Sequence, residues 1–180
     1  MRGLNEARYF VFRDLIIPTG YKNLPLTQID HVVVSHYGIF CIETKSNQGS
    51  IYGYTKSKNW KQYLGADNIY TINNPYSQNR GHVHALNALL KGTLRAPIHD
   101  YVTFPNAKKV TIDGCVEDLS LNGIVEKIAH HTQPVYNDAS VERIAKMLAH
   151  AAAYRNVLRD RHIEEVRAYL EVKVARTLRY

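Results

Sequence analysis

The chain of 180 residues is long enough for one domain with a sizeable core, and its 45% hydrophobic and 22% charged residues are typical of a globular protein. Its two cysteines without a C-x-x-C pair argue against a zinc knuckle or a disulfide framework, and no apolar stretch approaches a membrane span of about 20 residues. The net charge of +7 favours an anionic partner such as nucleic acid, and the lack of a signal-peptide pattern leads us to expect a cytoplasmic protein without membrane contact.

The first half of the chain predicts one helix and a set of short strands. Helical spacing of apolar residues predicts a short helix at 3–14, ended by Pro18 and Gly20. Alternating β-branched residues predict a strand at about 28–35 and a second at 39–45, and the short turn between them makes an antiparallel hairpin. Two more strands are expected between residues 49 and 63, with Trp60 on the second.

The second half is mainly helical. Asn74 before Pro75 marks a helix start, and Gly92 marks its end. Two short strands are expected within 98–113, followed by helices at 120–131 and from 138 onward. The apolar stripe of this last segment loses its phase at 159–162, where we expect a break before a final helix at 163–174.

This element order predicts an α/β fold with a mixed sheet flanked by helices. Residues 1–136 would form one domain. The C-terminal helices at 137–180 would form an extension that packs on the same domain or on a partner copy, which makes a homodimer possible.

A group of charged residues falls at one end of the predicted hairpin. Asp30 lies near the start of the first strand, while Glu43 and Lys45 lie at the end of the second and share a face. Two carboxylates and the carbonyl of Thr44 would supply oxygen ligands for Mg²⁺ or Mn²⁺. The ammonium of Lys45 would stabilise charge on an attacked phosphate.

These parts suffice for metal-dependent phosphodiester hydrolysis, but each has a simpler interpretation. Asp30 can cap the turn before its strand, and Glu43 with Lys45 can form an ordinary surface pair worth well under ~1 kcal/mol. The E-x-K pattern alone is weak, and the matching position of Asp30 strengthens it.

The spacing D-x(12)-E-x-K resembles the signature of the PD-(D/E)XK nucleases. The surrounding sequence resembles the nuclease-related domain, NERD, over roughly residues 3–120, in the segments TQIDHVVVSHYGIFCIETKSNQGSIYG and NNPYSQNRGHVHAL. The resemblance implies a restriction-endonuclease-like fold and a divalent-metal-dependent nuclease that acts on DNA rather than RNA. It also implies that Asp30, Glu43 and Lys45 form the active-site triplet.

The resemblance implies two further site residues. Glu6 would aid the metal site from the first helix, and Gln78 would join from the helix after the core strands. A related Q-x-x-x-Y pattern calls for tyrosine at 82, where this chain has His82, and we interpret the histidines as surface or structural residues. Glu6 can equally be an acid that favours a helix start, and Gln78 an exposed helix residue.

Basic and aromatic residues alternate between positions 52 and 80. Lys56, Lys58, Lys61 and Arg80 lie among tyrosines, which is typical of a surface that contacts phosphates and stacks on bases. Arg80 is the favoured phosphate contact because it lies beside Gln78; packing of tyrosines on sheet edges is the alternative. The predicted function is therefore a nuclease, and its rival is a catalytically silent module of the same fold that binds nucleic acid or dimerises.

Overall fold

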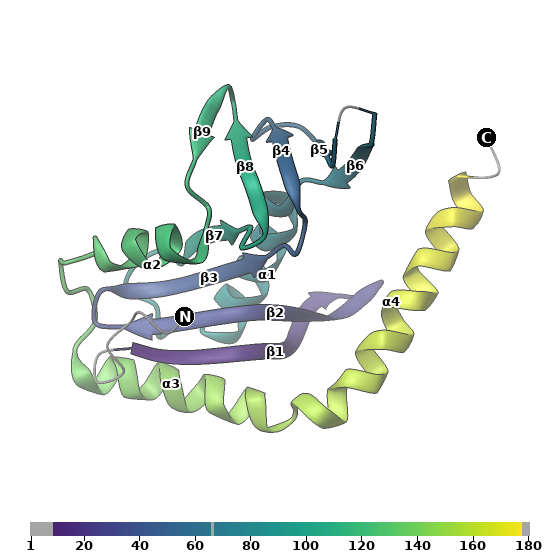
Figure 1. Ribbon diagram of the computed structural model, residues 1–180. Coiled ribbons are helices and arrows are strands. Elements are labelled where there is room, and N and C mark those ends of the chain that lie inside the picture. Colours follow the sequence, from purple (N-terminus) through teal and green to yellow (C-terminus); the bar gives the residue numbers. More distant parts are fainter. Residues whose placement is uncertain (1–8, 66, 178–180) are drawn as a thin grey trace.

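The computed structural model describes residues 9–65 and 67–177, which form two mixed sheets and four helices (Figure 1). The first sheet has the strand order β1 (Tyr9–Tyr21), β2 (Leu24–Ser35), β3 (Gly38–Thr44) and β7 (His99–Thr103). The second has the order β6 (Ile69–Asn73), β5 (Asn59–Tyr63), β4 (Gly49–Gly53), β8 (Ala107–Ile112) and β9 (Cys115–Glu117). The helices are α1 (Pro75–Leu89), α2 (Leu121–Ala129), α3 (Asp138–Ala153) and α4 (Arg155–Thr177).

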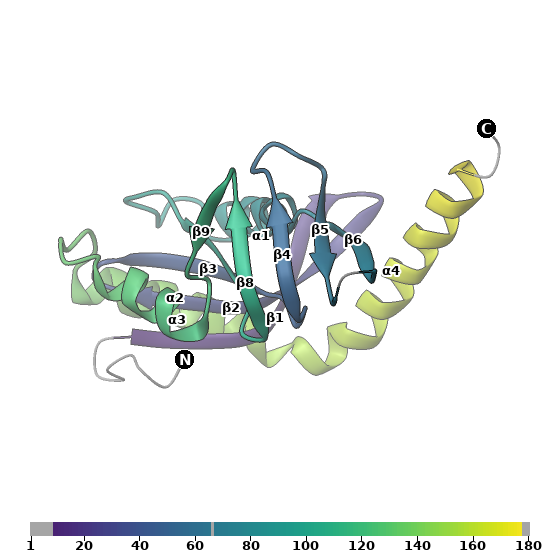
Figure 2. The same ribbon diagram turned by 45° about the horizontal axis from the view of Figure 1, so that its top comes forward.

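The first sheet separates two hydrophobic cores. Strands β1, β2 and β3 are antiparallel neighbours, and β7 joins β3 in parallel. One face packs on α1 and α3 through a cluster that includes Val32, Cys41, Leu86 and Ile144. The other face packs on the second sheet and α2, and Figure 2 shows that sheet standing across the first one. This α/β arrangement is consistent with the restriction-endonuclease-like fold expected from the sequence.

The helix predicted at 3–14 is wrong from Tyr9 onward, because this segment is the start of β1. β1 pairs with β2 along most of its length, from Tyr9 opposite Ser35 to Pro18 opposite Leu26. Asp14 has a left-handed backbone with φ of 56°. This irregularity interrupts the alternation of the strand and leaves apolar spacings that resemble those of a helix. Residues 1–8 lie outside the described part of the chain.

The break predicted at 159–162 lies earlier, at Tyr154. This residue caps α3 with φ of −89° and ψ of 1°, and α4 then runs without interruption through 159–162. The first turns of α4 are held by Asp14 of β1, which pairs with Arg155 at 3.7 Å and with Arg159. Ile163 remains 41% exposed on this chain, so burial of the C-terminal helix against a second copy stays a prediction.

The other predicted elements are confirmed, including the β2–β3 hairpin, β4, β5, β7, β8, α2 and the start of α3. Asn74 caps α1, and its side chain accepts from the backbone N–H of Tyr76. Strands β6 and β9 were not expected, because both are short, mostly exposed edge strands with little apolar alternation. The sequence also predicted one sheet where the structure has two.

Helix α1 is attached to the sheet by the fully buried amide of Asn79. Its Nδ2 donates to the carbonyls of Cys41 at 3.0 Å and Tyr101 at 2.8 Å, and to Oδ1 of Asp100 at 2.5 Å. Its Oδ1 accepts from the thiol of Cys41, whose pKa is raised mainly by burial. One side chain thus bridges β3 and β7 and fixes the height of α1 over the sheet.

Replacing Asn79 by leucine should lower the free energy of unfolding by about 2–3 kcal/mol, because it leaves buried acceptors without a donor. Urea denaturation measures this change. Asn87→Leu is the matched control, since Asn87 is exposed on the same helix and its replacement should change stability by less than about 0.5 kcal/mol. Equal stabilities of the two variants would show that the amide network does not hold the helix.

Gly53 is required by the close approach of Trp60, because a Cβ at position 53 would lie 2.1 Å from Cδ2 of the indole. Gly53→Ala should therefore destabilise the protein by about 1–3 kcal/mol. Gly81→Ala should change stability in the opposite direction. It should stabilise α1 by roughly 0.5–1 kcal/mol, since a Cβ at position 81 meets no atom within 4 Å. Thermal melting of both variants checks the pair, and a tolerated alanine at 53 would contradict this account of the Trp60 contact.

Candidate functional site

The site begins where the β2–β3 ladder ends. The pair furthest from the hairpin turn is His31 opposite Ile42, and the next residues on the two strands are Asp30 and Glu43. In place of another backbone carbonyl, Oδ2 of Asp30 accepts from the N–H of Thr44 at 2.8 Å. The strand phase also changes here, because Ile29 and Val32 both belong to the core on the α1 side. The irregularity directs the Asp30 carboxylate toward the end of β3.

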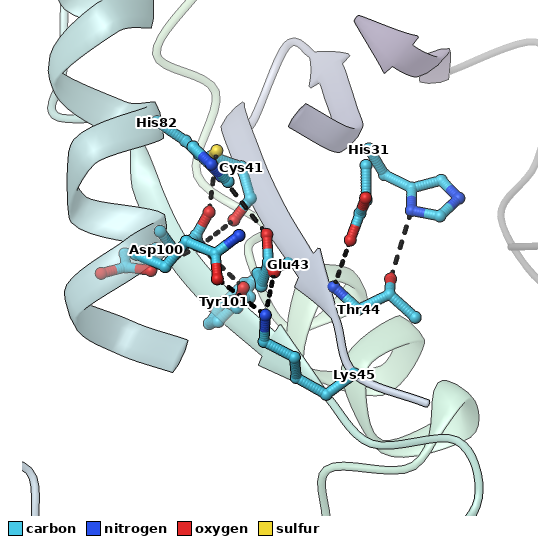
Figure 3. A network of polar contacts seen from close by, with 11 residues as sticks. His31, Cys41, Glu43, Thr44, Lys45, His82, Asp100 and Tyr101 are labelled. Atoms are coloured by element: carbon cyan, nitrogen blue, oxygen red, sulfur yellow. Dashed lines mark hydrogen bonds and ion pairs between the residues drawn. The ribbon is translucent and has the colours of Figure 1, made fainter. Parts of the chain in front are cut away.

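Glu43 is an acid inside the protein, with only 3% of its surface exposed. Burial raises the pKa of this carboxyl, the hydrogen bond and charge of Lys45 oppose that rise, and the negative charge of Asp30 adds to it. Nζ of Lys45 lies 2.5 Å from Oε1 of Glu43 (Figure 3). The charge of Asp30 thus adds to the effect of burial in disfavouring ionisation of Glu43.

Gln78 holds Lys45 from the other side. Its Oε1 accepts from Nζ of Lys45 at 2.7 Å, and it comes from the first turn of α1. The sequence placed Gln78 in the site, and the structure brings it to Lys45. The ammonium is therefore fixed between a carboxylate and an amide, which restricts a side chain that is otherwise flexible.

His82 is a site residue that the sequence analysis missed. It is 4% exposed on α1, and its Nδ1 lies 3.4 Å from Oε2 of Glu43 (Figure 3). Burial lowers the pKa of His82 to about 4, with Asp30 opposing that effect and Lys45 and His162 adding to it, so the imidazole is neutral near pH 7. Nδ1 has no hydrogen-bond partner within the part of the chain that the structure describes.

The spacing of Gln78 and His82 could have revealed this role. Residues four apart lie on one face of a helix, so Gln78-x-x-x-His82 directs both side chains toward the end of β3. His84, two residues further along α1, is on another face and stacks on Tyr21. His82 thus occupies the position at which the related Q-x-x-x-Y pattern has tyrosine.

The donors present fit a small, hard divalent cation. Asp30, Glu43 and the carbonyl of Thr44 offer oxygen ligands, and Mg²⁺ in proteins commonly takes one or two carboxylates and completes its shell with water. Across residues 9–65 and 67–177, no group of three or more His, Cys, Asp or Glu side chains is placed so that it could hold a metal ion. A bound cation would oppose the burial, and the smaller repulsion by Asp30, that raise the pKa of Glu43, whereas a thiolate or multi-histidine centre is not supported.

The four predicted nucleic-acid contacts separate in the structure. Lys58 lines a cavity of about 520 Å³ that Gln78 and His82 also line. Arg80 is exposed on α1 and donates to the Ser77 hydroxyl at 2.9 Å. It lies two residues after Gln78, and residues two apart on a helix do not share a face, so Arg80 is directed away from the side of Gln78. Lys61 is exposed on β5 and donates to Thr71, and Lys56 is exposed between β4 and β5. Glu6 lies outside the described residues.

Comparison with known proteins places the chain in a family. Among the described helices, none is both long and apolar enough to span a membrane. No solved structure matches the chain. It is 34% identical over 91 residues to an uncharacterized protein of Bacillus anthracis. The aligned segment covers 51% of this chain and 42% of that relative's length. The model of the nuclease-related domain matches residues 1–105, more than half of the sequence, and the chain therefore belongs to the nuclease-related domain (NERD) family.

Proposed function

We propose that this protein is a divalent-metal-dependent nuclease that hydrolyses phosphodiester bonds of DNA. The observation that carries the proposal is the position of the Lys45 ammonium, fixed between Glu43 and Gln78 beside a second carboxylate, Asp30. A surface ion pair of no function would not need a buried carboxylate, a helix amide and an adjacent acid. Membership of the nuclease-related domain family supports the same chemistry.

Asp30 and Glu43, with the carbonyl of Thr44, would hold Mg²⁺ or Mn²⁺. When bound, such an ion makes a water molecule easier to deprotonate and offsets the charge of a phosphate. The hydrogen bond from the Thr44 amide fixes one oxygen of Asp30. His82 stays neutral against Glu43, so it does not compete with a cation through its own charge.

Lys45 would act on the phosphate. Its ammonium donates to the oxygen on which negative charge develops during attack, and its fixed position makes that interaction effective without reorganisation. Gln78 would position Lys45 and would not touch the reacting atoms, because its Oε1 is already used by the ammonium. The alternative, a silent binding module of the same fold, keeps these contacts but hydrolyses nothing.

Glu43→Gln and Asp30→Asn should each abolish metal binding and cleavage together, because the ion loses a charged ligand. Lys45→Ala should still bind the ion, yet cleave roughly 10²–10³ times more slowly. Calorimetric titration with Mn²⁺ measures binding, and labelled plasmid, linear and single-stranded DNA with Mg²⁺, Mn²⁺ or EDTA measure cleavage. EDTA should stop the wild-type reaction.

The matched control is Lys146→Ala, which removes an exposed lysine that pairs with Glu142 on α3 and should leave both readouts unchanged. Melting curves show that each variant is folded. Cleavage at the wild-type rate by Lys45→Ala would contradict the mechanism. DNA binding by the wild-type protein without cleavage under any metal condition would favour the silent module.

Binding to DNA should be largely electrostatic, given the net charge of +7. Measured in EDTA, affinity should fall steeply between about 50 and 200 mM salt. Lys58→Ala should reduce the slope of log affinity against log salt by about 1, because it removes one phosphate contact next to the site. An affinity that hardly changes with salt would overturn this prediction, and Lys146→Ala again serves as the control.

A further inference from the structure

A cavity of about 520 Å³ adjoins the candidate site. It lies where the far end of the β1–β2 hairpin, the first turns of α1 and helix α4 come together, and Figure 1 shows α4 passing beside that hairpin end. Its volume falls within the roughly 300–1,000 Å³ of small-molecule sites in proteins. The side chains that matter most for its chemistry are Tyr21, Lys58, Gln78, His82 and Tyr169.

The cavity and the candidate site share a wall. Gln78 and His82 line the cavity and also reach the other way, to Nζ of Lys45 at 2.7 Å and to Oε2 of Glu43 at 3.4 Å. A group bound in the cavity would therefore be one side chain away from a phosphate bound at Lys45. A group in that position would be the nucleotide next to the scissile phosphate on the same strand.

Two tyrosines supply ring surface to the cavity. Tyr21 is 57% exposed and stacks on His84, with ring centroids 5.5 Å apart and planes at 23°. Tyr169 of α4 is 41% exposed and contributes from another wall. The face of an exposed aromatic ring is apolar surface in contact with water, which is unfavourable. An unpaired base offers a flat face that can stack on the ring and cover it.

The charge of the cavity also suits a nucleotide. Among the described residues that line it, none is acidic, and Lys58 adds a positive charge. The polar side chains of Thr27, Asn73 and Ser77 also line it and can offer hydrogen bonds to a base or sugar. An acidic peptide would not use the ring faces, and a stacked duplex presents ring faces only at its ends.

We propose that this cavity binds an unpaired nucleotide of DNA beside the scissile phosphate, so that single-stranded DNA is the preferred substrate class. The inference rests on the proposed nuclease function and adds the strand form on which it acts. Tyr21 and Tyr169 would stack on the base, while Lys58 would contact the adjoining phosphate.

Binding measured by fluorescence anisotropy in EDTA tests the cavity without cleavage. Tyr21→Ala and Tyr169→Ala should each weaken binding of a short single strand by about 5- to 100-fold, the typical effect of losing one stacking partner, and should change duplex binding much less. Tyr154→Ala is the matched control, because Tyr154 is 50% exposed between α3 and α4 and does not line the cavity. An oligonucleotide with one abasic position should bind wild type more weakly than the intact oligonucleotide does. The difference in affinity between wild type and the tyrosine variants should also be smaller for this oligonucleotide.

Cleavage assays keep this inference separate from the proposed function. If wild type cleaves DNA with Mg²⁺ but prefers duplex, or if both tyrosine variants bind and cleave single strands as wild type does, the cavity proposal is wrong and the nuclease stands. If no DNA is cleaved while the tyrosine variants still lose single-strand binding, the nuclease proposal fails and the nucleotide site stands. A single-stranded RNA of the same sequence that binds more tightly than DNA would overturn the assignment to DNA.

Discussion

The contact between Lys45 and Glu43 is the interaction on which the site depends. A carboxylate with 3% exposure has lost most of its hydration, which raises its pKa, and a positive charge beside it opposes that rise. Lys45 supplies that charge in the structure, and a divalent ion would share the task. Under the proposed function the lysine would have two roles: its charge opposes the effect of burial on the pKa of Glu43, and its ammonium would act on a phosphate.

Helix α1 assembles most of the surroundings of that contact. Gln78 orients Lys45, Asn79 bridges β3 and β7, and His82 closes the space behind Glu43. These three side chains lie within five residues of one helix. The position of α1 over the sheet is therefore set by a buried amide, while the site itself uses the residues on either side of that amide.

Much of this arrangement could be predicted from the sequence where the signals are local. The β-branched run before His36 and the short turn specify the β2–β3 hairpin, and the register then brings Asp30 to the end that carries Glu43. The capping Asn74 before Pro75 marks the start of α1. The family resemblance places Gln78 in the site, although only the structure shows that its partner is Lys45.

The missed features depend on tertiary contacts. The helix predicted at 3–14 overlaps the first residues of β1 because a left-handed Asp14 breaks the alternation of that strand, and only pairing with β2 reveals it. The break at Tyr154 directly precedes Arg155 and Arg159, whose pairing with that same aspartate is a contact between distant segments. The spacing of Gln78 and His82 indicates a shared helix face, but the burial of His82 against Glu43 also depends on how α1 packs on the sheet, which is a tertiary contact.

The parallel pairing of β3 with β7 has a consequence for the order in which the protein assembles. Phe40 pairs with His99, so this ladder joins segments about sixty residues apart, whereas β2 and β3 meet across a two-residue turn. Loop-closure entropy favours the short contact first and makes distant parallel pairing slow. Asp30 and Glu43 can therefore meet early in folding, while β7 and the Asn79 bridge complete their enclosure late. During that interval the two acids face water together, and the apolar face of the hairpin is open to other chains.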